Sequence, residues 1–437
     1  MSVARRVLRG TALATLLTLT TSSAAYAASA DPSDGGLWYY TQSGMEQLHQ
    51  RTTGEGVTIA VIDTGINPGA PGLAEADLEV HEPSYCAAEE GGPALPAASD
   101  QPASAHGTGI TSLLVGDGER PDGRPGVLGV APGATVHYYS VDAAEGQVTC
   151  LPPSDNGRDR DAFGDAVAAG ADIINVSAAM LIDEADYAAA IRAGVIVVGA
   201  AGNGGGEVLG SPAELNGTVA VGTATPEAAL DPGSPTGPAL GVVAPGTDFL
   251  CVAEDFVTEA RCTGSSNATA YTSGVLALAW SAHPDATGNQ ILQALVRSTD
   301  GEAIHEPRRD DEWGYGLVNA RLLLETDPTS YPDVNPFVRD DPEAFPPATA
   351  LLGASPEPTA APGADQGDDG AGAVPDADSD AGGAPLLLLV GGIIGLIVVS
   401  AIVIAVALSA RRRSRAGTAD PHQHSTASQT HQGGFRG

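Results

Sequence analysis

Short apolar runs rich in β-branched residues alternate with alanine-rich stretches in the larger, N-terminal part of this chain. Each run is bounded by Gly, Asp or Pro, which is typical of strands. The runs are GVTIAVID (56–63), TVHYYSVDA (135–143), DIINVSA (172–178), VIVVGAAG (195–202) and TVAVGTA (218–224). Near-continuous apolar strands separated by helices indicate an α/β fold with a mostly parallel central sheet flanked by helices on both faces.

Polar residues stand where several of these runs end or where a helix begins. Asp63 closes the first run, and His106 precedes a helical stretch at 107–116. Asn203 follows another run at a glycine-rich turn, and Ser266 lies at a strand-to-helix turn. Each residue alone has an ordinary structural explanation, since Asp and Asn both favour turns. Active sites in such sheets lie beyond the carboxyl ends of the strands, so we expect these four residues to meet there.

These four residue types together suit acyl transfer. A serine hydroxyl is a weak nucleophile at neutral pH and needs an adjacent base, a role that we assign to His106. Asp63 would accept from the other ring nitrogen and stabilise the imidazolium. Asn203 would donate its side-chain amide to the developing oxyanion, beside the backbone N–H of Ser266. The expected catalytic set is therefore Asp63, His106, Asn203 and Ser266.

The order Asp, His, Ser is that of subtilisin, and the sequence resembles the subtilase family of serine proteases from about Gly54 to Ala320. In the family's serine motif, Gly264 takes the glycine position, Ser265 the threonine position and Ser266 the nucleophile position. Ser273 falls too far along the helix to reach the turn. The stretches that carry the resemblance are VIDTG, HGTG, GVAPGA, AAGNGG, VVAPG, GSSNATA and GYGLVNA.

The sequence also departs from the family pattern. Ala270 replaces the motif's proline, and Gly109 stands where the family usually has histidine. Residues 177–180 replace a strand that in the family borders the specificity pocket, so unusual specificity is expected. Residues assigned to substrate binding by this resemblance are Ser177, Ala178, Ala179 and Gly202. We expect no cofactor; many subtilases bind calcium, but no metal site is identifiable in this sequence.

The two ends of the chain predict a location. Residues 1–30 have a basic start, a short apolar run and small residues, as in a secretory signal peptide. The arginine pair at the start leaves twin-arginine export open. Residues 386–409 carry no charge and are long enough to span a bilayer. Arginines follow at once, which places the tail, residues 410–437, in the cytoplasm and the N-terminal part outside.

Composition divides the chain between the predicted signal peptide and the predicted membrane span into two segments. Residues 31–325 are expected to form a subtilisin-like peptidase domain with a short N-terminal extension. Residues 326–385 are rich in Pro, Ala, Gly and Asp and are predicted to be a disordered linker. The net charge of −34 excludes nucleic acid as a partner, because phosphate binding needs a basic surface.

Four cysteines lie in the part predicted to be outside the membrane, which suggests two disulfides. Four cysteines allow three pairings. We favour Cys251 with Cys262, which are close in sequence, and Cys86 with Cys150.

This architecture is similar to that of the mycosins, the membrane-anchored subtilases of actinobacterial type VII secretion systems. The resemblance implies a serine endopeptidase acting on protein or peptide substrates beside a membrane secretion complex. Two alternatives belong to other classes of protein. One is a scaffold that keeps the subtilase fold with little proteolysis, and the other is a surface adhesion module.

Overall fold

The computed structural model describes residues 35–141, 151, 161–178, 180, 182–207, 210–301 and 303–352. The predicted signal peptide, membrane span and tail lie outside these residues, and so does the predicted linker beyond residue 352. Within the described residues, no helix has both the length and the apolar character that crossing a bilayer requires.

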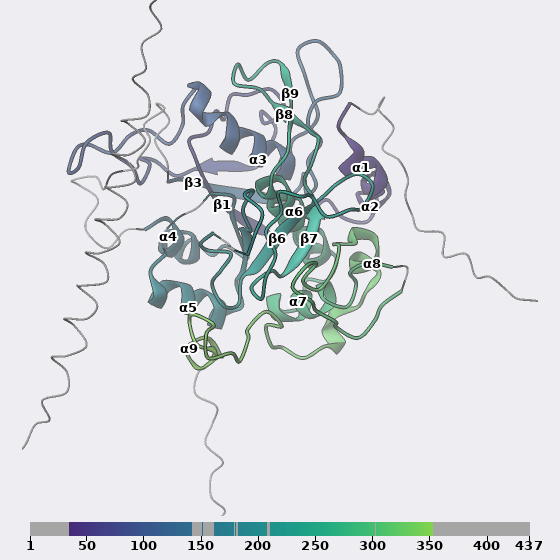
Figure 1. Cartoon of the computed structure of the whole chain (residues 1–437). Coiled ribbons are helices and arrows are strands. Elements are labelled where there is room, and N and C mark those ends of the chain that lie inside the picture. Colours follow the sequence, from purple (N-terminus) through teal and green to yellow (C-terminus); the bar gives the residue numbers. More distant parts are fainter. Residues whose placement is uncertain are drawn as a thin grey trace, which may run out of the picture. The chain divides into compact units, whose positions relative to one another are not determined.

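A seven-stranded parallel sheet forms the centre of the described fold (Figure 1). The strand order is β2-β3-β1-β4-β5-β6-β7, so β1 lies between β3 and β4, at the point where the chain changes direction across the sheet. Ligands bind at such switch points, beyond the carboxyl ends of the strands. The strands are β1 (Thr58–Asp63), β2 (Leu78–Val80), β3 (Thr135–Ser140), β4 (Ile173–Val176), β5 (Ile196–Ala200), β6 (Val219–Ala224) and β7 (Val242–Pro245). The predicted α/β fold with a mostly parallel sheet is confirmed.

In β1 and in β4 to β7 nearly every residue is buried, because both faces of this part of the sheet are covered, and these strands are accordingly apolar at most positions. In β1, Ile59 and Val61 face a core that includes α3 (Ala105–Val115) and α6 (Ser265–Ala282). Ala60 and Ile62 face the opposite core, with α4 (Ala162–Ala168) and α5 (Glu184–Ala193). The alternation follows from the two-residue period of a strand.

The N-terminal extension packs on this domain through two short helices, α1 (Trp38–Gln42) and α2 (Met45–Leu48). Trp38 and Met45 are buried, and the ring of Tyr39 stacks on Phe249 with centroids 4.4 Å apart. Phe249 opens an antiparallel hairpin, β8 (Phe249–Val252) and β9 (Glu259–Cys262), which leads directly into α6. The extension is therefore attached to the segment that precedes Ser266.

The C-terminal part of the described chain continues beyond the predicted domain boundary. After α7 (Gly288–Leu295) and α8 (Ala320–Glu325) come a 3₁₀ turn, η3 (Pro328–Ser330), and α9 (Ala348–Leu352), which lies beside α5 (Figure 1).

The linker was predicted to begin at residue 326, whereas the packed chain extends to Leu352. The buried side chain of Asn216 holds this segment: its Nδ2 donates to the carbonyls of Arg339 and Pro346, both at 3.0 Å. Its Oδ1 accepts from the N–H of Arg339 at 2.7 Å. The boundary was wrong because average composition conceals a few anchoring residues, among them the buried Phe337.

Candidate active site

Asp63 and His106 meet at the carboxyl end of the sheet. Asp63 is the last residue of β1 and is fully buried, and His106 lies in the first turn of α3. The Nδ1 atom of His106 lies 2.6 Å from Oδ1 of Asp63. The same carboxylate oxygen accepts from the backbone N–H of Thr64 at 2.6 Å, which fixes the carboxylate plane. The side chain of His106 is 44% exposed, so its other face remains open to a reactant.

The Asp63 carboxylate raises the pKa of His106 above its ordinary value, mainly through its charge. Partial burial of the ring lowers this pKa and the hydrogen bond to Asp63 raises it further. The second oxygen of Asp63, Oδ2, is buried and has no hydrogen-bond partner among the described residues, so the charge is weakly screened. An imidazole whose charged form is stabilised in this way is a stronger base.

Asn203 and the start of α6 form the second part of the site. The N–H of Ser265 donates to Oδ1 of Asn203 at 2.8 Å, and the N–H of Gly202 donates to Oγ of Ser265 at 3.0 Å. Because Oδ1 of Asn203 accepts from this backbone donor, its Nδ2 remains the group that can donate to a further partner. A Cβ atom on Gly264 would lie 3.3 Å from Oγ of Ser266 and 3.5 Å from both Nδ2 and Oδ1 of Asn203. The glycine therefore keeps open a space that the serine hydroxyl and the amide share.

Ser265 and Ser266 have different environments, as the motif alignment predicts. Ser265 is buried and uses its hydroxyl to fasten the turn after β5. Ser266 is the second residue of α6, where the positive end of the helix dipole favours developing negative charge. The structure thus brings together Asp63 with His106 and Asn203 with Ser266, and α3 packs against α6.

The residues assigned to substrate binding lie around the same end of the sheet. Ser177 follows β4, and its hydroxyl donates to the carbonyl of Ser266 at 3.2 Å. Gly202 has a φ of +110°, a conformation that favours glycine. The structure also describes Ala178, whereas Ala179 lies outside the described residues. Their contact with substrate stays a prediction.

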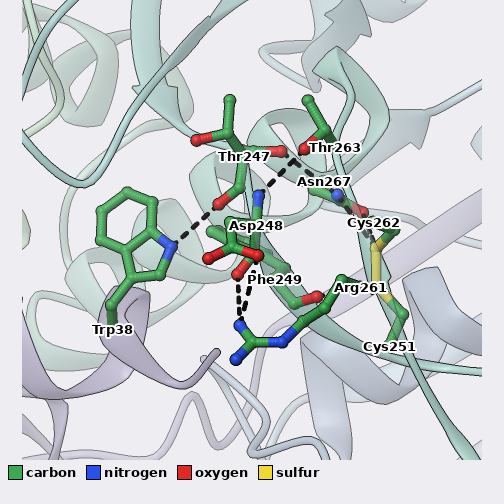
Figure 2. The surroundings of a disulfide bond; sticks show 10 residues. Trp38, Thr247, Asp248, Phe249, Cys251, Arg261, Cys262, Thr263 and Asn267 are labelled. Carbon is green, nitrogen blue, oxygen red and sulfur yellow. Dashed lines mark hydrogen bonds and ion pairs between the residues drawn. A yellow bond between two sulfur atoms is a disulfide. The ribbon is translucent and has the colours of Figure 1, made fainter. Parts of the chain in front are cut away.

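A disulfide between Cys251 and Cys262, one of the two pairings favoured from the sequence, joins β8 to β9 four residues before Ser266 (Figure 2). Asn267 donates to Sγ of Cys262 and to the carbonyl of Gly246, both at 3.3 Å. Trp38 of the N-terminal extension donates to the carbonyl of Thr247 at 2.8 Å. The turn before the candidate nucleophile is thus fastened on both sides. Cys86 is buried, and its predicted partner Cys150 lies outside the described residues.

Tyr138 was not predicted to belong to the site. Its hydroxyl donates to the carbonyl of Thr64 at 2.7 Å, directly beside Asp63. Burial, and the charge of Asp63, raise the pKa of Tyr138 far above its ordinary value, so the hydroxyl keeps its proton and remains a donor. Only the register of β3 against β1, in which Tyr138 pairs with Val61, reveals this proximity.

The part of the chain that the structure describes holds no group of three or more His, Cys, Asp or Glu side chains arranged for a metal ion. The proton and oxyanion chemistry described above involves protein groups alone.

The fold and this site define a subtilisin-like α/β domain with the residues of a serine hydrolase. The sequence matches the subtilase family, peptidase S8, over residues 54–316. That match covers more than half of the chain, which therefore belongs to this family of serine endopeptidases.

Individual relatives agree with this assignment. The chain is 27% identical over 304 residues to the halolysin-like extracellular serine protease Nep of Natrialba magadii, covering 68% of this chain and 53% of that protein. The chain thus spans about half the length of that relative. It is 28% identical over 362 residues to mycosin-1 of Mycobacterium tuberculosis, covering 69% of this chain and 75% of mycosin-1.

Among solved structures, MycP1 from the ESX-1 type VII secretion system has a similar fold, with a TM-score of 0.52. The identity is 23%, and the similarity covers 69% of this chain and 88% of that one. The predicted subtilase membership is confirmed, and the similarity to mycosin-1 supports the predicted mycosin-like assignment.

Proposed function

We propose that this chain is a membrane-anchored serine endopeptidase that cleaves protein or peptide substrates outside the cytoplasmic membrane. The observation that carries the proposal is the pair of contacts at the end of the sheet. Oδ1 of Asp63 lies 2.6 Å from Nδ1 of His106, and Asn203 and Ser266 border the space beside Gly264. Membership of the subtilase family supports the same assignment.

The first chemical step forms an acyl-enzyme. Oγ of Ser266 attacks the scissile carbonyl carbon while Nε2 of His106 takes the hydroxyl proton. The negative charge of Asp63 stabilises the resulting imidazolium. The oxyanion accepts from Nδ2 of Asn203 and from the N–H of Ser266, at a helix N-terminus that favours negative charge.

The second step releases the products. His106 returns its proton to the leaving amine nitrogen, the C–N bond breaks, and the amine departs. A water molecule then loses a proton to His106 and attacks the ester carbon. The bond between that carbon and Oγ of Ser266 breaks, and His106 returns the proton to Oγ, which releases the carboxylic acid and restores the serine. The C–N bond is hydrolysed with no net change in the enzyme.

A cleavage assay tests this proposal. The full-length chain in detergent is incubated with a library of unmodified peptides, and new termini are identified by mass spectrometry. Ser266→Ala and His106→Ala each abolish the new termini, and the double variant is no worse than either, because members of one catalytic unit are not additive. Cleavage that persists unchanged in Ser266→Ala contradicts the proposal.

We further propose that the domain is tethered by residues 386–409 and works beside a type VII secretion complex. The uncharged stretch followed by arginines supports the tether, and the similarity to mycosin-1 and MycP1 supports the link to secretion. Protease added to spheroplasts is expected to remove residues 31–385 and to leave the tail protected. Digestion of the tail instead of residues 31–385 would show that the orientation in the membrane is the opposite one.

A further inference from the structure

A chain of three hydrogen bonds connects the interior of α6 to the candidate nucleophile. The hydroxyl of Ser273 donates to Oδ1 of Asn175 at 3.0 Å. Nδ2 of Asn175 donates to Oγ of Ser177 at 3.0 Å, and that hydroxyl donates to the carbonyl of Ser266 at 3.2 Å. Ser273 and Asn175 are fully buried, and Ser177 is 8% exposed. The chain thus runs from the middle of α6 to β4 and back to the first turn of α6.

The direction of each bond follows from the donors available. A serine hydroxyl has one proton, so a Ser177 oxygen that accepts from Asn175 directs its own proton at Ser266. The orientation of the Asn175 amide is set in turn by Ser273, which donates to Oδ1. If the amide turned over, its oxygen would face Ser177 and attract the proton that now goes to Ser266. Through Asn175, Ser273 therefore determines the direction of the Ser177 hydroxyl, although Ser273 itself makes no hydrogen bond to Ser177.

The other buried hydroxyls in this part of α6 behave differently. Thr269 and Thr272 donate to carbonyls of their own helix, those of Ser265 and Ala268. Ser273 alone among these three sends its hydroxyl bond to another element. A buried polar side chain costs stability unless it is hydrogen-bonded, and these three side chains meet that requirement through one another and the carbonyl of Ser266. This arrangement suggests a role besides packing.

We propose that Asn175 and Ser273 are positioning residues for the reaction, acting through Ser177. They hold the segment Ser177–Ala178, predicted to run along a bound peptide, at a fixed distance from Ser266. The inference rests on the proposed protease function. It assigns to Asn175 and Ser273 the alignment of a peptide carbonyl with the serine hydroxyl, which is where small displacements cost rate.

This role separates two reactions of the same serine. Hydrolysis of an extended peptide needs both Ser266 and the 177–178 segment in place. Phosphonylation of Ser266 by a small fluorophosphonate, in which Oγ attacks phosphorus and fluoride leaves, needs the serine, its base and the oxyanion donors, but makes no use of that segment. Loss of the hydrogen-bond chain should therefore slow peptide hydrolysis while leaving the fluorophosphonate reaction largely intact.

The test compares Ser273→Ala with a matched control, Thr272→Val, in the full-length chain. Both variants lose one fully buried hydroxyl from adjacent positions of α6. Ser273→Ala should lower kcat/KM for a peptide substrate roughly tenfold. This loss is smaller than the roughly hundredfold loss in rate that a displacement of about 1 Å causes, because we expect a smaller displacement here. The rate of fluorophosphonate labelling should stay within about twofold. Thr272→Val should change neither rate. Ser273→Cys, which fills the same space with a weaker donor, should give an intermediate loss.

A double variant identifies the route. If Ser273 acts through Ser177, then Ser177→Ala with Ser273→Ala should be no slower on the peptide than Ser177→Ala alone. Losses that multiply overturn the inference, and so does a Ser273→Ala chain that melts earlier but cleaves peptide at the normal rate. If the unmodified chain does not react with the probe, the proposed protease function fails, and this inference fails with it. If the unmodified chain reacts and Ser273→Ala cleaves peptide normally, only the inference fails.

Discussion

The side chain of Asn203 is held by the N–H of Ser265, which donates to its Oδ1 at 2.8 Å. That bond fixes the orientation of the amide. Oδ1 accepts from the start of α6, so Nδ2 is the atom of the amide that can still donate, and the amide borders the space beside Gly264. An oxyanion donor that is already oriented needs no reorganisation during the reaction.

Asn203→Ala should lower kcat by about 10²–10³, the range found when one oxyanion donor is removed from a protease of this family. KM should change much less, because the donor acts mainly in the transition state. Asn203→Asp is the matched control: it keeps the acceptor for Ser265 but replaces the donor with a charged oxygen. It should fold normally and be at least as slow as Asn203→Ala in steady-state peptide hydrolysis. An active Asn203→Asp chain contradicts the oxyanion assignment.

Gly264→Ala should impair the reaction without unfolding the protein. The φ of Gly264 is 171°, an extended conformation that alanine adopts without strain. The added Cβ would lie 3.3 Å from Oγ of Ser266, in the space that Ser266 and Asn203 border. We expect a loss of about 10–100-fold in kcat, with a melting temperature close to that of the unmodified chain.

Gly109→Ala provides the control for that change. Gly109 lies within α3, and a Cβ there would have no neighbour within 4 Å. Alanine in a helix interior is about 0.5–1 kcal/mol more stable than glycine, so this variant should be at least as stable and equally active. Equal losses at both positions would show that Gly264 has no special relation to Ser266.

Activity should depend on the ionisation of His106. The base must be neutral to accept the serine proton, so kcat/KM rises with pH through the pKa of His106. Asp63 raises this pKa, and the acid limb should therefore have its midpoint above the ordinary histidine value of about 6.5. Asp63→Asn removes the charge, so the midpoint should move to lower pH while kcat falls by roughly 10⁴. A midpoint that stays in place in Asp63→Asn contradicts the pairing.

Much of this fold and site could be predicted because the signals are local. An apolar run that ends in Asp63, and glycines that surround Asn203, are features of a few consecutive residues. Tyr138 and the Ser273–Asn175 contact depend instead on strand register and helix packing, which join residues far apart in sequence. Strand β7 was not among the predicted strands, because its four residues, VVAP, are too few to show an alternating pattern.

The segment from 326 to 352 was missed for a related reason, because its order depends on docking rather than on composition. Asn216→Ala should loosen it, since three hydrogen bonds to Arg339 and Pro346 are lost. Leaving buried backbone groups without partners costs about 1–3 kcal/mol in the free energy of unfolding. Limited proteolysis should then cut within 326–352. Asn289→Ala loses one exposed bond, to Asp333, and should leave both stability and cleavage pattern unchanged.

The identity of the nucleophile is the central claim, and labelling by a serine-directed fluorophosphonate tests it most directly. The full-length chain is treated with the probe, digested, and mapped by mass spectrometry. The account predicts a single modified residue, Ser266, with labelling abolished in Ser266→Ala and at most weakened in Ser265→Ala, whose hydroxyl fastens the turn. Labelling that persists in Ser266→Ala, or a folded chain that takes no label at all, contradicts the account.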